Sequence, residues 1–376
     1  MRIFPKIILF FLVFSFGFDF FNFRTKYHLA CLLPLNGEKK ILAQDTLKGL
    51  LLGLEIFKKD SNFILSIYDT EGNPMAVTQA LEKIAKDDYE MVIALLGKKT
   101  TLPAVIKART LGIPLIILSS EENLPLGDGI YRDFITPKIQ IENLLNFVMA
   151  ELGLSTFVIF CPKDTYGQKF SRLFKEEVEK KGGEIKAIIT YLPGTTDFGP
   201  QIKKLIGKEI AEAKPETLLE KPPKLPFEAV FIPDIYLNSA FIISQFAYYN
   251  VRDLIFLGTT LWGHPKFAQM IKGNCQAAYF PTGFTLQARQ PWVQEFIAEF
   301  RKTYKTFPNY LSAQGYEVGK ILVYLKSLKN LHLENAYEAI QNFPGVTGLT
   351  SFLSNGEVKK KIYIMEISNG IVNLVY

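Results

Sequence analysis

The segment from Leu154 to Leu205 constrains the fold of this chain more than any other part of the sequence. It contains a short, continuous apolar run from Phe157 to Cys161 that ends at Pro162, which is typical of a strand covered on both faces. A helical pattern follows, because apolar residues recur at helical spacing: Phe170, Leu173, Phe174 and Val178. A second apolar run, from Ile185 to Tyr191, and a Pro-Gly turn come next. Alternation of this kind predicts an α/β fold built around parallel strands.

The same alternation continues on both sides of that segment. A chain of 376 residues is longer than a single hydrophobic core usually grows, so we expect two lobes. We expect the first helix to begin at Asp45 and Thr46, which can cap it, and two long helices at roughly residues 292–304 and 311–329. The remaining predicted strands are Tyr27 to Leu33, Phe63 to Tyr68, Met91 to Leu96 and Pro114 to Leu118 in the first lobe, and Ala229 to Ile232, Leu254 to Leu257 and Ala277 to Phe280 in the second.

Several short motifs occur in a fixed order along the chain. Leu32 to Gly37 form the end of the first strand and the loop after it, Asp164 to Gln168 and Gly194 to Phe198 lie in the second lobe, and Pro344 to Gly348 lie near the end. In this order they resemble the first ligand loop, the second-lobe signature and the closing hairpin of type I periplasmic solute-binding proteins, the leucine/isoleucine/valine-binding kind. The resemblance covers nearly the whole chain after residue 26.

This resemblance implies two Rossmann-like lobes, each with a parallel sheet flanked by helices, joined by three hinge crossovers. Lobe I is expected to comprise residues 27–137 and 285–344, and lobe II residues 138–284 and 345–376. Residues 209–227 interrupt the pattern with charges and four prolines, and we interpret them as a linker-like insertion. They are either a tolerated surface insertion or a feature of one subfamily. The second interpretation rests on a resemblance: a charged, proline-containing insertion before an apolar strand and an Ile-Pro-Asp sequence, here Ile232-Pro233-Asp234, is similar to that of the solute-binding-like penicillin-binding protein activators.

Residues 1–26 predict export from the cytoplasm. Arg2 and Lys6 precede an uncharged run from Ile7 to Phe18, which is the layout of a secretory signal peptide; an uncleaved N-terminal anchor is the alternative. We therefore expect a periplasmic or other extracytoplasmic location, with membrane contact only through this segment. Cys31 resembles part of a lipoprotein site but falls inside the first predicted strand, so we expect a buried thiol there. Whether Cys161 and Cys275 pair is left open by the sequence.

Ligands in open α/β sheets bind at the carboxyl ends of the strands, where loops meet helix N-termini. The loop from Gly97 to Pro103 offers free N–H groups and two hydroxyls, which suit an anionic group such as a carboxylate. The family resemblance places a carboxylate-binding serine or threonine about here, which implies Thr100 and Thr101. The alternative is that one of these threonines only caps its own helix.

The resemblance implies further contacts from both lobes. Tyr166 matches a family aromatic residue that covers the ligand, and Ser119 and Glu121 lie in a loop that supplies polar contacts in the family. Tyr236 and Trp262 either add to the aromatic wall or pack the hinge. The full candidate set is therefore Thr100, Thr101, Ser119, Glu121, Tyr166, Asp234, Tyr236 and Trp262.

One departure from the family concerns the group that would pair the ammonium of an amino acid. Amino-acid binders of this kind use an acidic residue in the second lobe, but the expected loop, Thr260 to Gly263, contains no carboxylate. Asp234 or Glu121 would have to take this role, because an unpaired buried ammonium costs several kcal/mol.

Other function classes lack their motifs. The sequence contains no Gly-x-Ser-x-Gly elbow, no His-Glu-x-x-His and no dinucleotide glycine fingerprint after a strand, so we expect neither an enzyme nor a cofactor. Three cysteines and three histidines at scattered positions give no metal-ligand spacing. The net charge of +6 is spread along the chain, and no nucleic-acid motif accompanies its basic clusters.

These observations predict an exported, non-enzymatic protein whose lobes close on a small polar ligand, an amino acid or a related carboxylate, for delivery to an ABC permease. The alternative is an envelope interaction protein of the same bilobed fold that regulates peptidoglycan synthesis. Fold resemblance does not separate the two functions, since sites rather than folds carry function.

Overall fold

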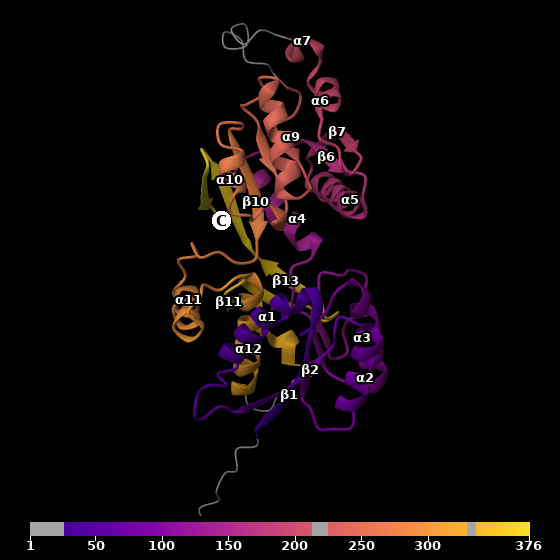
Figure 1. The fold of residues 1–376 in the computed structure, drawn as a ribbon, viewed down its shortest axis with the longest axis vertical. Helices are drawn as coiled ribbons and strands as arrows, with labels where there is room; N and C mark the ends of the chain where they lie inside the picture. The colour runs from indigo at the N-terminus through magenta and orange to yellow at the C-terminus, as the bar shows by residue number, and fades with distance from the viewer. Residues whose placement is uncertain (1–25, 213–224, 329–335) are drawn as a thin grey trace, which may run out of the picture.

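The computed structural model describes residues 26–212, 225–328 and 336–376. The strands form two large sheets and one small sheet, and Figure 1 shows the large sheets in two lobes stacked along the long axis of the molecule. We call the lobe that begins with β1 (Tyr27–Leu33) lobe I and the lobe that contains β6 (Thr156–Pro162) lobe II. The predicted α/β fold with two lobes is confirmed.

Lobe I is built on a five-stranded parallel sheet in the order β2-β1-β3-β4-β5. Apolar side chains cover both of its faces: in β1, Leu29 and Leu33 point into one core, and Ala30 and Leu32 point into the other. The other strands are β2 (Phe63–Asp69), β3 (Met91–Leu95), β4 (Leu115–Leu118) and β5 (Ile130–Arg132). The helices are η1 (Gly37–Lys39), α1 (Lys40–Gly53), α2 (Pro74–Ile84), α3 (Lys98–Leu111), α11 (Pro291–Tyr304), α12 (Tyr310–Ser327) and η3 (Tyr337–Ala339).

Lobe II is built on a seven-stranded sheet in the order β15-β14-β10-β9-β8-β6-β7. The strands from β10 to β7 run parallel, whereas β14 pairs antiparallel with β10 and β15 pairs antiparallel with β14. Besides β6, the strands are β7 (Glu184–Tyr191), β8 (Ala229–Phe231), β9 (Ile255–Leu257), β10 (Ala277–Thr282), β14 (Tyr363–Ser368) and β15 (Ile371–Leu374). The helices are α4 (Pro137–Ala150), α5 (Thr165–Lys180), α6 (Gly199–Ile206), α7 (Lys208–Ala211), α9 (Tyr236–Tyr248), η2 (Thr260–Trp262) and α10 (Phe267–Met270).

A small antiparallel sheet lies where the two lobes meet. It consists of β11 (Phe343–Gly345), β12 (Gly348–Phe352) and β13 (Val358–Lys361). Its Phe352 and Val358 pack in the core of lobe I, so the expected lobe boundary at residue 345 lies inside this sheet.

The described chain passes between the lobes at residues 133–136, at residues 283–290 and at Ile362. The first of these segments joins β5 to α4, the second joins β10 to α11, and the third joins β13 to β14. Their arrangement fits the three hinge crossovers that the sequence predicts.

The predicted strands are found at the expected places, but the predicted start of the first helix is wrong. The helix begins at Lys40 after the 3-10 turn of η1, so Asp45 and Thr46 lie inside it. Asp45 accepts a hydrogen bond at 2.7 Å from Asn309, which is the N-cap of α12. The Thr46 hydroxyl donates to the carbonyl of Leu42 within the same helix. Both side chains therefore have roles that local capping patterns do not reveal.

The cysteines are all free thiols, and Cys31 is fully buried in β1 as expected. The proposed signal or anchor lies in residues 1–26, of which 1–25 are outside the described residues, as are residues 213–224 of the expected insertion. Across the described ranges, none of the helices combines the length and hydropathy that a membrane-spanning helix requires.

Candidate functional site

The N-terminus of α3 carries the first two candidate residues. Gly97 is the N-cap; its N–H donates to Thr100 Oγ1 at 3.0 Å, and the hydroxyls of Thr100 and Thr101 approach its carbonyl at 3.0 and 2.9 Å. Both threonines are buried, and Thr100 caps its own helix, which agrees with the alternative interpretation of this motif. The N–H groups of Lys98 and Lys99, at the first two helical positions, have no intrahelical acceptor and point out of the helix end. These two N–H groups are the donors that remain for an anionic ligand.

The loop after β4 lies beside this helix end. Thr101 Oγ1 and Ser119 Oγ are 2.8 Å apart, and both side chains are buried. Their contact follows from the topology, because β3 and β4 are neighbouring parallel strands whose carboxyl ends lie at the same edge. The N–H of Glu121 donates to Ser119 Oγ at 3.3 Å, and the Glu121 side chain is half-buried. The structure thus gathers the lobe I candidates in one corner.

A buried arginine that the sequence interpretation missed holds this loop. Arg132 is fully buried, and its Nη1 donates to the carbonyl oxygens of Ser119, at 2.9 Å, and of Glu121. Its Nε and Nη2 contact the Glu357 carboxylate at 2.8 and 3.2 Å, a two-point contact that fixes the guanidinium plane. Glu357 lies 225 positions further along the chain, so no local pattern predicts this pair.

Tyr166 is the candidate at the start of α5 in lobe II. Its hydroxyl donates to Thr259 Oγ1 at 2.9 Å, and its ring lies 4.5 Å from that of Phe170, measured between centroids. Burial raises the pKa of the Tyr166 phenol well above its usual range, so the group stays protonated and acts as a donor. The helix end beside it is capped by Asp164, which accepts the Gly167 N–H at 2.7 Å.

Asp234 and Tyr236 follow β8 at the same edge of the lobe II sheet. The Asp234 carboxylate is buried and accepts three hydrogen bonds, from the Tyr191 hydroxyl at 2.7 Å, the Asn238 amide at 3.0 Å and the Ile235 N–H at 2.7 Å. Its capacity to pair a ligand ammonium is therefore largely used within the protein. Tyr236 stacks on His264 with ring centroids 3.9 Å apart and remains partly exposed.

Trp262 does not occupy the expected ligand wall. Its side chain is 1% exposed and packs in the lobe II core, and its Nε1 donates to Ser239 Oγ at 2.9 Å. Gly258 makes room for the indole, since a Cβ at that position would overlap the ring. The correction has a simple physical reason: the indole finds both an apolar pocket and a hydrogen-bond partner inside the lobe. We assign it a packing role.

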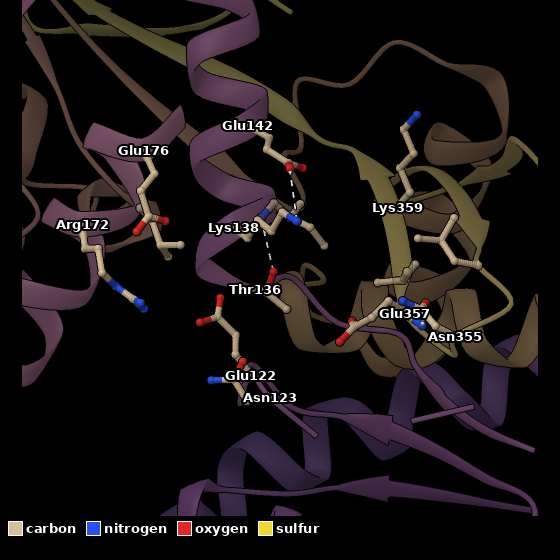
Figure 2. Close-up of a pocket in the computed structure, with 14 residues that line it drawn as sticks. Glu122, Asn123, Thr136, Lys138, Glu142, Arg172, Glu176, Asn355, Glu357 and Lys359 are labelled. Atoms are coloured by element: carbon tan, nitrogen blue, oxygen red, sulfur yellow. Dashed lines mark hydrogen bonds and ion pairs between the residues drawn. The ribbon is translucent and has the colours of Figure 1, made fainter. Parts of the chain in front are cut away.

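A groove of about 540 Å³ opens at the boundary between the lobes (Figure 2). Figure 2 shows Glu122 from the loop after β4 and Arg172 and Glu176 from α5 pointing into the same space. Glu122 also forms an ion pair with Lys169 of α5 at 3.0 Å, which links the two lobes. The rest of the lining comes from the start of α4 and the β12–β13 hairpin, including Thr136, Lys138, Glu142, Asn355, Glu357 and Lys359.

None of the eight candidate residues lines this groove. It nevertheless adjoins the candidate site, because Glu122 directly follows Glu121 and Lys169 lies about one helical turn after Tyr166. Both basic and acidic side chains line it, so the groove has no single sign of charge. Within the described ranges, no group of three or more His, Cys, Asp or Glu side chains is arranged to hold a metal ion.

Comparisons with known proteins agree with this architecture. The sequence matches the family model described as periplasmic binding protein over residues 26–370. No curated protein sequence matches the chain.

Among solved structures, a protein from Rhodospirillum rubrum described as a branched-chain amino acid ABC transporter superposes with a TM-score of 0.78 at 17% identity, covering 93% of this chain and 100% of that one. The isoleucine-bound substrate-binding protein LivJ from Streptococcus pneumoniae gives 0.63 at 20% identity, with coverage of 93% and 99%. The C-domain of LpoA from Haemophilus influenzae, a regulator of PBP1A, gives 0.64 at 15% identity, with coverage of 93% and 100%.

The identities to these structures are low, so the superpositions establish the fold and not the ligand. The family match covers most of the chain and agrees with the two parallel-stranded lobes and the crossovers between them. The chain therefore belongs to the periplasmic binding protein family and has its type I fold.

Proposed function

We propose that this protein is an extracytoplasmic solute-binding protein that captures an amino acid or related carboxylate between its lobes and delivers it to an ABC permease. The observation that supports this most directly is the corner of lobe I where Thr101 and Ser119 meet the N-terminus of α3. Residues 1–26 would serve as the export signal or as an anchor. The proteins named LivJ and LpoA illustrate that this fold serves both transport and regulation.

The α3 N-terminus suits the carboxylate of such a ligand. The backbone N–H groups of Lys98 and Lys99 have no acceptor within their own helix, the helix dipole adds positive potential, and the first turn contains no acidic residue. The amine of Lys39 lies against Gly97, because a Cβ there would overlap its Nζ, and this adds a positive charge at the helix end. In this proposal the hydroxyls of Thr100, Thr101 and Ser119 position the helix end and the adjacent loop.

Lobe II would close over the ligand from the other side. Tyr166 and Tyr236 offer aromatic surface at the carboxyl edge of its sheet, and Thr259 holds the Tyr166 hydroxyl. Since Asp234 is already occupied by three donors, Glu121 is the candidate carboxylate with more capacity to pair an ammonium. The Glu122–Lys169 ion pair next to both loops would favour the closed arrangement.

A second candidate function is regulation of peptidoglycan synthesis at the cell envelope. The observation that favours it is the occupied Asp234 together with the buried Trp262, which removes two expected ligand contacts. In that case the lobes would serve as a scaffold for a protein partner, and small ligands would leave the protein unaffected.

A thermal-shift screen of the purified protein against amino acids, small carboxylates and peptidoglycan fragments tests the proposal. A ligand present at 100 times its dissociation constant should add about 2.7 kcal/mol of stability. A clear upward shift with amino acids or carboxylates supports solute capture. The absence of a shift with every compound favours the regulatory function instead.

The double variant Thr101→Val with Tyr166→Phe should reduce the affinity for any ligand found in that screen by at least about tenfold, because each hydroxyl orders a binding element. Isothermal titration calorimetry provides the measurement. The matched control is Thr110→Val with Tyr304→Phe: Thr110 bonds the carbonyl four residues before it, as Thr101 does, and Tyr304 donates to the Lys48 carbonyl. Equal affinities of the two double variants would contradict the site assignment.

A further inference from the structure

Three charged side chains are buried together at the hinge. Lys360, Glu317 and Asp133 all have 0% side-chain exposure, and Lys360 Nζ lies 2.8 Å from Asp133 Oδ1 and 2.7 Å from Glu317 Oε1. Asp133 is the first residue of the crossover from β5 to α4, and Lys360 lies two residues before the crossover at Ile362. Their ion pair therefore ties two of the three crossovers together, and Glu317 of α12 anchors it to lobe I.

The backbone at Lys360 is also tied to lobe II. Asn143 of α4 donates to the Lys360 carbonyl at 2.9 Å and accepts from the Ile362 N–H at 3.1 Å. Any rotation of α4 relative to lobe I therefore acts on the β13–β14 crossover as well as on the Asp133 segment. The cluster lies at the junction where the positions of the two lobes are coupled.

The two carboxylates of the cluster are held unequally. Glu317 accepts four hydrogen bonds, from the Thr347 N–H at 2.7 Å, the Thr347 hydroxyl at 2.8 Å, the Thr350 hydroxyl at 2.6 Å and Lys360 at 2.7 Å. Asp133 has its ion pair with Lys360, but neither of its carboxylate oxygens has a well-oriented hydrogen bond among the described residues. Two buried carboxylates facing one ammonium leave a surplus negative charge, which is costly in a buried site.

The surroundings of Asp133 favour its protonated form. Burial raises its pKa and the nearby Glu317 carboxylate raises it further, whereas Lys360 and the Gln314 side chain act in the opposite direction. The titratable groups that face it are Lys360 from β13, Glu317 and Tyr310 from α12, and Tyr337 from η3. Lys360 itself is held charged, because the two carboxylates raise its pKa despite burial.

We propose that the Asp133–Lys360–Glu317 cluster is a proton-dependent lock on the hinge. With Asp133 ionised, its ion pair with Lys360 holds two crossovers together and the lobes keep a narrow range of angles. With Asp133 protonated, the ion pair is replaced by a weaker contact between the Lys360 ammonium and a neutral carboxyl, and the lobes sample a wider range. This role concerns lobe motion itself and applies to either proposed function.

Distance measurements between spin labels on the two lobes test the proposal. Labels are placed at two exposed helical positions, Lys83→Cys in lobe I and Lys204→Cys in lobe II, in a Cys275→Ser background. In the otherwise unaltered protein, the distance distribution should be broader at the lower of two pH values, chosen on either side of the observed midpoint, because Asp133 takes up its proton as the pH falls. Asp133→Asn should give the broad distribution at both pH values.

The matched control is Asp128→Asn, which removes an exposed carboxylate of lobe I that pairs with Arg109 at 2.8 Å. It should leave the distribution and its pH dependence unchanged. Distributions of Asp133→Asn that equal those of the control at both pH values would overturn the proposal. So would a pH-dependent broadening that persists in Asp133→Asn, since another group would then be responsible.

Two further measurements keep the proposal testable if Asp133→Asn folds poorly. Glu317→Gln leaves Asp133 alone with Lys360, so the broadening should shift to lower pH; an unchanged midpoint would contradict the lock. Stability provides the second readout. The folded-state pKa of Asp133 exceeds its unfolded value of about 3.9. The contribution of Asp133 to the free energy of unfolding is therefore complete below the unfolded pKa and is lost as the pH rises through the folded pKa. A urea denaturation midpoint that does not fall as the pH rises would also contradict the proposed lock.

Discussion

Replacing Lys360 with methionine should lower the free energy of unfolding by about 3–5 kcal/mol, because two buried carboxylates would lose the cation that pairs with both of them. The Lys360 ammonium forms ion pairs with Asp133 and Glu317 and donates to the Thr347 hydroxyl, and its side chain has no exposure to water. Methionine keeps a similar chain length, so the loss should come from charge and hydrogen bonding rather than from a cavity. Urea denaturation followed by circular dichroism measures the change.

Two comparisons separate this charge effect from general damage. Lys186→Met removes the partner of an exposed Glu184 in an ion pair of lobe II and should change the stability by less than about 1 kcal/mol. Adding Asp133→Asn and Glu317→Gln to Lys360→Met should recover part of the lost stability, since no buried charge would remain unpaired. If Lys360→Met costs no more than Lys186→Met, the cluster contributes nothing to stability, and its proposed role at the hinge fails with it.

Much of the fold was predictable because the buried strands have continuous apolar sequences. β1 and β6 are covered on both faces over most of their length, so each contains a continuous apolar run, residues 29–33 and 157–161, that shows in the sequence. The contact between Thr101 and Ser119 was predictable for a topological reason, as both residues follow neighbouring parallel strands. Local pattern and topology were sufficient for these features.

The remaining features depend on contacts between distant residues. Arg132 is buried because Glu357 and two loop carbonyls accept its protons, and none of these partners is nearby in the sequence. A tryptophan in the loop after a strand can face the core or the solvent, so the position of Trp262 in the sequence does not predict its burial. A local signal for this burial is Gly258, four residues earlier. The same limit applies to the α1 start, where Asp45 serves the cap of α12 instead of its own helix.

The packing of α1 against α12 in lobe I leads to the second large effect. Four glycines let the two helix backbones touch: Gly49 and Gly53 in α1, and Gly315 and Gly319 in α12. A Cβ on Gly315 would overlap the Thr46 carbonyl oxygen, and one on Gly49 would overlap the Ser312 carbonyl oxygen. These obstacles are backbone atoms of helices, which cannot rotate away as a side chain can.

Gly315→Ala should therefore destabilise the protein by about 2–3 kcal/mol, as overpacking in a close-packed core does. The sign is informative, because the same change inside an unconstrained helix stabilises by up to about 1 kcal/mol. Gly263→Ala is the control, since Gly263 has a φ of −69° and its nearest obstacle lies at an ordinary contact distance of 3.4 Å; it should be neutral or slightly stabilising. Thermal and urea denaturation of both variants measure the difference. If Gly315→Ala leaves the free energy of unfolding unchanged, α1 and α12 can separate without cost. The loops that α1 and β1 support at the candidate site would then be less rigidly held than the structure indicates.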